Sequence, residues 1–267
     1  MAAAASQKCA GGHQPGNAIG SIFLMLARDE TMLFKTPSRD RLERMEVAAT
    51  RIVDCMHALN QAAENLITVA LRGSDEFLEW DHYPSGDIYD PNSHAQYYFH
   101  CHPPDERAEP DYGHFHTFLR LPAGKLRSGR VHLASDPTDA VENNLCHLVA
   151  ISMTSTGLPE RLFTTNRWVT GECWQPASQV ISLLDQFSID LEHPSRPLNL
   201  WLTEMLVLFR PQIESLLIQR DMAVGQWQNE HRDIDVFENR ELEVTSSVRI
   251  SLYDQIEWLD RKLDEKA

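Results

Sequence analysis

The segment AQYYFHCHPPDERAEPDYGHFHTFLRL, residues 95–121, decides the fold class and the chemistry expected of this chain. It contains two His-x-His pairs, His100 with His102 and His114 with His116, each flanked by aromatic and apolar residues that favour β-strands. Turn-forming residues separate the pairs. We therefore expect an antiparallel hairpin. Because residues two apart in a strand point to the same face, each pair presents two imidazoles side by side.

The register of this hairpin controls whether the four imidazoles meet. If His102 lies opposite His114, then His100 lies opposite His116 and all four rings share one face. Directly opposed side chains have Cβ atoms about 4.5–5.5 Å apart, which suits the ligands of one metal ion. A slip of one residue would separate the pairs. The predicted metal ligands are His100, His102, His114 and His116, while Cys101 is expected on the opposite face.

Imidazole ligands favour a divalent transition metal, with iron or zinc expected and copper or nickel also compatible. Three histidines with an open position would form a catalytic site, whereas four would form a structural or redox site. A carboxylate or a further histidine could complete the site from the neighbouring loops, although turn formation explains such acidic residues equally well. These candidates are Asp87, Asp90, Glu106, Asp111, His82 and His94.

Two arginines are the predicted catalytic residues, with the task of holding an anionic substrate. Arg120 shares the strand face of His114 and His116, where a buried guanidinium needs a carboxylate from the protein or from a substrate. Arg167 lies in LFTTNRWVTGE, which we predict to continue a strand near the hairpin. A structural ion pair is the alternative interpretation of Arg167.

The remaining chain predicts an α+β fold, in which a central antiparallel sheet or small barrel is flanked by N- and C-terminal helices. Residues 38–72 carry one apolar stripe at helical spacing, residues 77–170 are mostly β, and residues 176–265 are mostly helical. We expect a flexible tail over residues 1–20 and a single domain over residues 21–267. RVHLAS is a further strand candidate, and Pro211 should interrupt a helix.

Composition excludes several function classes. The formal net charge of −15 over 267 residues argues against nucleic acid as a partner. No apolar run of about 18 residues is present, so no membrane partner is expected. Five cysteines at irregular spacing, without a CxxC motif, favour a reduced, cytoplasmic compartment. The oligomeric state is not indicated.

The blocks SHAQYYFHCHP, GHFHTFLR, HLVAISM and RLFTTNRWVTGE, with LFRPQIESLL, resemble a family of uncharacterised bacterial proteins known as a domain of unknown function. The resemblance covers roughly residues 75–222 and implies no activity. A looser similarity links the His-x-His pairs to cupins, but the glutamate and glycine spacing expected after such a pair is missing.

These observations predict a metal-dependent enzyme, such as an oxygenase or a hydrolase, that acts on a small anionic metabolite. HExxH, P-loop and GxSxG motifs are missing, so protease, nucleotide-binding and α/β-hydrolase functions lack support. Two alternatives remain open. One is a metal-binding or sensing protein without catalysis, and the other is a ligand-binding module that uses the histidines without a metal.

Overall fold

The computed structural model describes residues 36–74, 76, 78–102, 111–121 and 144–265. These residues belong to one compact unit, Lys35–Ala267. The predicted tail over residues 1–20, the strand candidate RVHLAS and the candidate ligand Glu106 lie outside the described residues. The expected division into tail and domain therefore stays a prediction.

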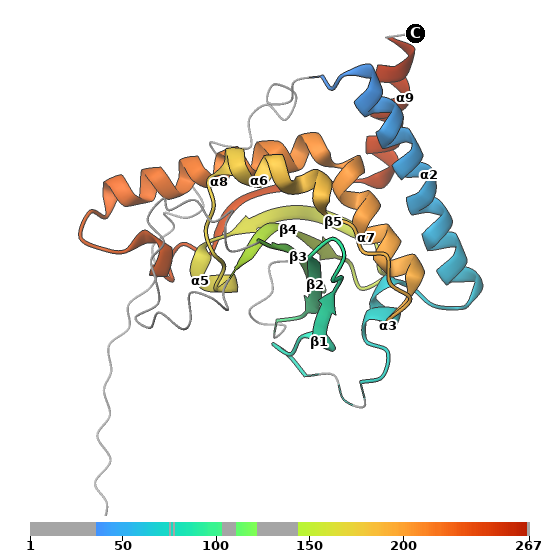
Figure 1. Cartoon of the computed structure of the whole chain (residues 1–267), viewed down its shortest axis with the longest axis horizontal. Coiled ribbons are helices and arrows are strands. Elements are labelled where there is room, and N and C mark those ends of the chain that lie inside the picture. The colour runs from blue at the N-terminus through green and yellow to red at the C-terminus, as the bar shows by residue number, and fades with distance from the viewer. Residues whose placement is uncertain (1–35, 75, 77, 103–110, 122–143, 266–267) are drawn as a thin grey trace, which may run out of the picture. The chain divides into compact units, whose positions relative to one another are not determined.

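Helices and strands segregate along the chain (Figure 1). The helices are α2 (Arg39–Gln61), α3 (Leu66–Ala70), α5 (Arg167–Thr170), α6 (Ala177–Leu183), α7 (Arg196–Leu208), α8 (Arg210–Glu230) and α9 (Leu252–Asp264), with 3-10 turns η2 (Leu184–Gln186) and η3 (Val236–Glu238). The strands are β1 (Tyr83–Tyr89), β2 (Ala95–His100), β3 (Gly113–Arg120), β4 (Leu145–Met153), β5 (Pro159–Thr165) and β6 (Val244–Arg249).

The strands form one six-stranded antiparallel sheet in the order β1-β2-β3-β4-β5-β6. The α+β class and the antiparallel sheet are therefore confirmed. The sheet is open, because β1 and β6 are its two edges and do not pair with each other. The alternative of a small barrel is wrong.

Local sequence explains most of the helix boundaries. α2 follows Ser38, and α8 begins at Arg210 with Pro211 in its first turn, so the predicted interruption at Pro211 separates α7 from α8. β6 was missed, since it lies in a region predicted to be mostly helical. Its sequence VTSSVR is polar, and tertiary contacts hold it: Ser246 donates a hydrogen bond to the carbonyl of Leu216 in α8 at 2.9 Å.

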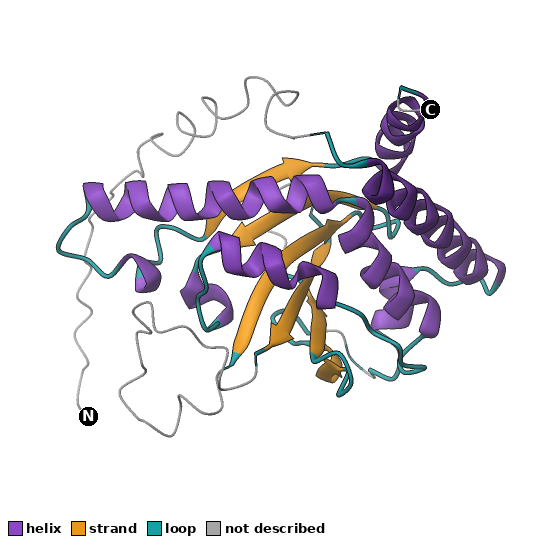
Figure 2. Cartoon of the chain, turned by 45° about the horizontal axis from the view of Figure 1, so that its top comes forward, coloured by secondary structure: helices purple, strands orange, loops and turns teal. Residues whose placement is uncertain are grey.

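The helices gather on one face of the sheet (Figures 1 and 2). Tyr97, Phe99 and Phe115 project from that face into a core shared with the helices. The ring of Phe115 lies 6.2 Å from that of Trp201, and the Tyr97 hydroxyl donates to Asn199 Oδ1 at 2.5 Å. Burying such large aromatic side chains is the main stabilising contribution of this face. Within the described residues, no helix is long and apolar enough to span a membrane.

The opposite face carries the histidines, and we call it the histidine face. On β2 and β3 it presents Tyr98, His100, His114, His116 and Phe118, all of them buried. Polar rings in such an environment need partners, because an unpaired buried polar atom is costly. The histidine face is therefore where a chemical function should lie.

Candidate metal centre

The hairpin pairs two residues away from the predicted register. His100 lies opposite His114 and Tyr98 lies opposite His116, so the prediction that His102 faces His114 is wrong. The shift is even, and side chains alternate with a period of two. All four histidines therefore still share one face, with ring centroids 4.5 Å apart for His100 and His114 and 5.1 Å apart for His102 and His114.

Gly113 fixes this register. A Cβ at position 113 would lie 2.5 Å from Cys101 Sγ, 2.6 Å from Phe99 Cζ and 2.8 Å from the carbonyl oxygen of His100. Only a residue without a side chain fits at that point, so β3 begins directly against the end of β2. Cys101 is fully buried in the core shared with the helices, as predicted for the opposite face.

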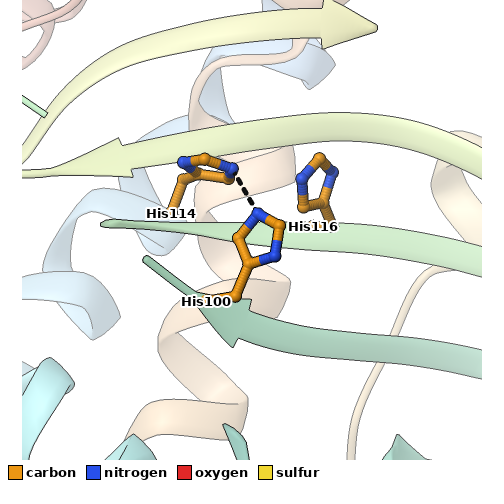
Figure 3. A group of neighbouring side chains, drawn as sticks. All are labelled: His100, His114 and His116. Atoms are coloured by element: carbon orange, nitrogen blue, oxygen red, sulfur yellow. Dashed lines mark hydrogen bonds between the residues drawn. The ribbon is translucent and has the colours of Figure 1, made fainter. Parts of the chain in front are cut away.

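Three of the histidines converge on one point (Figure 3). His100 from β2 and His114 and His116 from β3 each offer a ring nitrogen, and these atoms lie within 4.8 Å of one another. His100 Nε2 and His114 Nε2 are 2.7 Å apart. This buried group could hold a metal ion.

Asp111 sets the orientation of the His114 ring. Burial alone would raise the pKa of Asp111, but a hydrogen bond from His114 and the charges of His114 and Arg161 outweigh it and hold that pKa below its ordinary value. An ionised carboxylate only accepts hydrogen bonds. His114 Nδ1–H therefore donates to Asp111 Oδ2 at 3.2 Å, and His114 Nε2 keeps a lone pair directed at the group. Such carboxylate–histidine contacts support metal ligands.

His147 on β4 plays the equivalent part for His116. His147 Nε2 lies 3.1 Å from His116 Nδ1, while His116 Nε2 is buried without a hydrogen-bond partner. A bulge in β4 creates this contact: Thr117 pairs with Val149 but Phe118 pairs with His147, so the strand changes phase and turns His147 onto the histidine face. His147 is not among the residues predicted for the site.

Burial keeps these rings neutral. Burial and the neighbouring histidines lower the pKa of His100 to about 2. Burial also lowers the pKa of His116 well below its ordinary value. For His147, burial and the charge of Arg220 lower the pKa to about 3. Neutral imidazole is the form that binds a metal, so His100 and His116 are prepared for a cation at physiological pH.

His102 and His82 lie at the border of the centre. The His102 ring is 5.1 Å from that of His100 and 4.3 Å from that of Trp80. His82 stacks on Tyr98 at 3.6 Å, with its ring 5.9 Å from that of His100. His82 Nδ1 contacts Asp87 Oδ1 at 3.0 Å.

The other candidate ligands have local partners. Asp90 accepts a hydrogen bond from the main-chain N–H of Asn92 at 2.8 Å, which is turn chemistry, and one from the main-chain N–H of Asp190 at 2.8 Å, which joins this turn to a distant segment. His94 Nδ1 lies 2.7 Å from the Tyr89 hydroxyl, before the start of β2 and away from His100 at its end.

Arg120 and Arg167 stand in different surroundings. Arg120 Nε donates to Gln96 Oε1 at 2.7 Å, and its guanidinium lies over the Tyr89 ring at 5.4 Å. Arg167 is the first residue of α5, so the prediction that it lies on a strand is wrong. It forms an ion pair with Glu238, which is the structural alternative considered for it.

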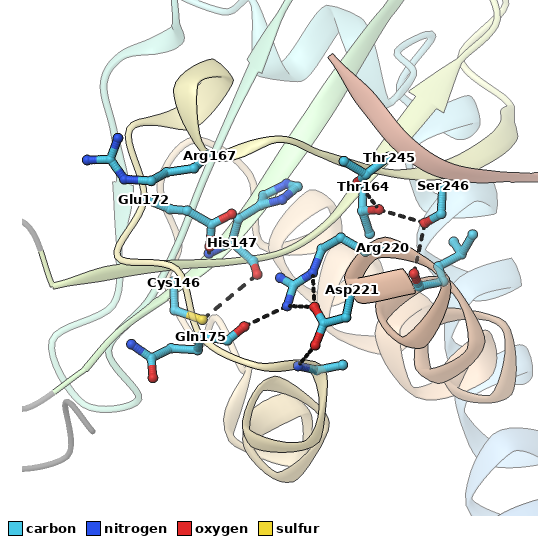
Figure 4. Close-up of polar contacts among 12 residues, drawn as sticks. Cys146, His147, Thr164, Arg167, Glu172, Gln175, Arg220, Asp221, Thr245 and Ser246 are labelled. Carbon is cyan, nitrogen blue, oxygen red and sulfur yellow. Dashed lines mark hydrogen bonds and ion pairs between the residues drawn. The ribbon is translucent and has the colours of Figure 1, made fainter. Parts of the chain in front are cut away.

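A buried carboxylate supports β4 behind His147 (Figure 4). Glu172 Oε2 accepts a hydrogen bond from the main-chain N–H of His147 at 2.9 Å. Burial raises the pKa of Glu172 to about 7, although the charge of Arg220 acts against the rise. Arg220 donates to the carbonyl of Gln175 at 2.6 Å and to Asp221 Oδ1 at 2.8 Å. This cluster fixes the end of β4 that carries His147.

A family model described as Domain of unknown function (DUF6969) matches residues 46–250, more than half of the chain. The match includes every residue of the candidate centre, and it confirms the resemblance to an uncharacterised family. No curated protein and no solved structure matches the chain.

Proposed function

We propose that this chain, which belongs to the DUF6969 family, is a metal-dependent enzyme whose centre is His100, His114 and His116. These histidines would bind one divalent transition metal ion, iron or zinc, and the substrate would be a small anionic molecule. The supporting observation is the convergence of three buried imidazoles on one point. A sheet gains nothing from burying such rings together unless they bind a ligand, since each loses hydration.

Two of the three nitrogens lie close to the spacing found in an occupied site, and all three lie within 4.8 Å of one another. Two nitrogens that bind one tetrahedral zinc at about 2.0–2.1 Å lie about 3.3 Å apart. His100 Nε2 and His114 Nε2 are 2.7 Å apart, so small ring rotations that separate these two nitrogens by about a further half ångström would admit the ion. Because His114 Nε2 accepts, the proton between these two nitrogens belongs to His100 Nε2, and it would move to His100 Nδ1 for a metal to bind there.

Three protein ligands leave a coordination position open, which is the arrangement of catalytic rather than structural sites. An ion there would activate water or dioxygen, or polarise a carbonyl. The protein would contribute the orientation of the ligand rings and a buried environment. Asp111 and His147 hold the outer nitrogens of His114 and His116, which fixes both rings, and the buried surroundings strengthen every charge interaction.

One observation favours a second function. The ring of His102 lies 5.1 Å from the rings of both His100 and His114. If His102 supplied a fourth ligand, the site would be closed, and the protein would bind or sense a metal without catalysis. Cobalt substitution separates the two functions, because an open site exchanges water and shows five-coordinate character on adding small anions, whereas a closed site stays tetrahedral.

Elemental analysis of the purified protein tests the metal directly. We expect about one equivalent of iron or zinc, removal by a chelator, and recovery on adding the metal back. The variants His116→Ala and His100→Gln should both lose the metal. His100 is the less buried of the two residues. His57→Gln, on the exposed face of α2, is the matched control and should retain it. A folded wild-type protein that contains no metal and takes up none would exclude both functions and leave the metal-free ligand-binding module.

A further inference from the structure

A row of polar residues runs from the metal centre across the sheet. His100 pairs with His114, His114 with Ser152, Ser152 with Arg161, and Arg161 with Arg249. Directly paired residues project from the same face. The register therefore places Arg161 and Arg249 on the histidine face, two and three strands away from His114, and the hairpin sequence does not indicate either.

The two arginines are an unusual pair. Like charges directly opposite each other in a sheet are destabilising unless an anion compensates them. Arg161 Nη2 contacts Asp111 Oδ2 at 3.2 Å and its guanidinium lies over the Phe163 ring at 5.1 Å. Arg161 is 24% exposed, so a small solute can reach it. Arg249 is exposed, and its positive charge acts on the described carboxylate of Glu160, whose pKa it lowers against the effect of burial.

The charge balance of the row favours an anion once a metal is present. Two carboxylates face the arginines: Asp111, which already bonds His114, and Glu160, which accepts a hydrogen bond from Ser152 at 3.3 Å. Two arginines and two carboxylates cancel. Histidine side chains carry no negative charge, so a divalent ion bound by them would add two uncompensated positive charges next to the row.

We infer that Arg161 and Arg249 bind the anionic group of the substrate, whose reacting group lies at the metal. The inference rests on the proposed function. β3 and β5 are two strand spacings apart, about 9–10 Å between backbones, and the side chains shorten that span. The substrate class is therefore a small organic acid whose carboxylate or phosphate is separated from the reacting group by a few bonds. Arg161 contacts Asp111, the carboxylate that orients the proposed ligand His114. Arg120 instead donates to Gln96, and Arg167 pairs with Glu238.

Titration of the zinc-loaded protein with succinate and with inorganic phosphate, followed by calorimetry, tests this inference. We expect at least one anion to bind, with affinity reduced about tenfold or more in Arg161→Met and in Arg249→Met, as expected for the loss of one charge-assisted contact. Arg249→Met leaves the Arg161–Asp111 pair intact, so the test stands even if Arg161→Met folds poorly. The matched control is Arg196→Met, whose guanidinium pairs with Asp190 and Glu192 on the surface.

The outcomes separate the two proposals. Unchanged affinity in both arginine variants, or no binding of either anion to the zinc-loaded protein, would overturn the inference. Anion binding lost in Arg120→Met but retained in Arg161→Met and Arg249→Met would overturn it in favour of Arg120. If the protein takes up no metal, the proposed function fails. Anion binding to the metal-free protein that still depends on Arg161 and Arg249 would then support the arginine site alone.

Discussion

The carboxylate of Asp111 accepts a hydrogen bond from Nδ1 of His114 at 3.2 Å, and both side chains are largely buried. The same oxygen accepts from Arg161. One carboxylate thus orients a proposed ligand and links it to the arginine row. Removing this carboxylate should weaken metal binding more than it destabilises the fold.

We predict that Asp111→Asn weakens zinc affinity about 10–100-fold, as is usual when a carboxylate that orients a histidine ligand is lost. The amide is isosteric and its oxygen can still accept, but without the negative charge it holds the proton on His114 Nδ1 less strongly. Competition with a chromophoric chelator measures the change. Asp190→Asn, a surface carboxylate, is the control and should bind zinc like the wild type. Equal affinity in the two variants would show that Asp111 does not orient the ring.

Gly113→Ala should destabilise the protein. The added methyl would clash with Cys101 Sγ at 2.5 Å and with the main chain of His100, so we expect a loss of about 1–3 kcal/mol in the free energy of unfolding. Urea denaturation measures it. Gly225→Ala on α8 is the matched control, because nothing lies within 4 Å of its Cβ and alanine should stabilise the helix by about 0.5–1 kcal/mol. If both variants changed the free energy of unfolding alike, the close fit of Gly113 against Cys101 would not explain the register.

Glu172 should make stability fall as pH rises. Its pKa is raised from 4.5 to about 7, so the folded state holds the proton more tightly and the contribution is present below about pH 4.5 and lost towards pH 7. Glu172→Gln does not titrate. The free energy of unfolding of Glu172→Gln relative to wild type should therefore increase by about 3 kcal/mol between those values. Urea denaturation at each pH is the measurement, with the exposed Glu192→Gln as a flat control. A pH-independent difference would contradict the raised pKa.

His147 should act in the opposite direction in the metal-free protein. Its folded-state pKa is lowered to about 3, so its contribution is present above about pH 6.5 and is lost as the pH falls towards 3. The expected slope is about 1.4 kcal/mol per pH unit for this group. His147→Gln should reduce the slope of stability against pH by that amount, whereas His57→Gln should leave it unchanged. Equal slopes in wild type and His147→Gln would show that the ring titrates normally.

The strands of the hairpin and the face of each histidine could be predicted because alternation is a local property of the sequence. The register could not. It depends on Gly113 fitting against Cys101, a contact between residues on two strands, and the length of the intervening loop does not determine it. The predicted register was wrong by two residues, which is an even number, so the predicted metal ligands still lie on one face of the sheet.

The remaining parts of the site come from strands that the hairpin sequence does not specify. His147 reaches the centre through a bulge in β4, which no periodicity reveals because it changes the phase of the strand. Arg249 lies on β6, whose polar sequence gave no strand signal. Arg161 lies in the region predicted to be mostly β, but its place in the row depends on two further registers.

The strand order has a consequence for how the chain folds. β1 to β5 pair in the order in which they are synthesised, so each can add to its predecessor by comparatively short-range contacts. β6 pairs with β5 only after the intervening helices α5 to α8, and such long loop closures are slow. Arg249 therefore meets Arg161 only when the last strand docks, whereas the pairing of β2 with β3 that brings the histidines together needs a much shorter loop closure.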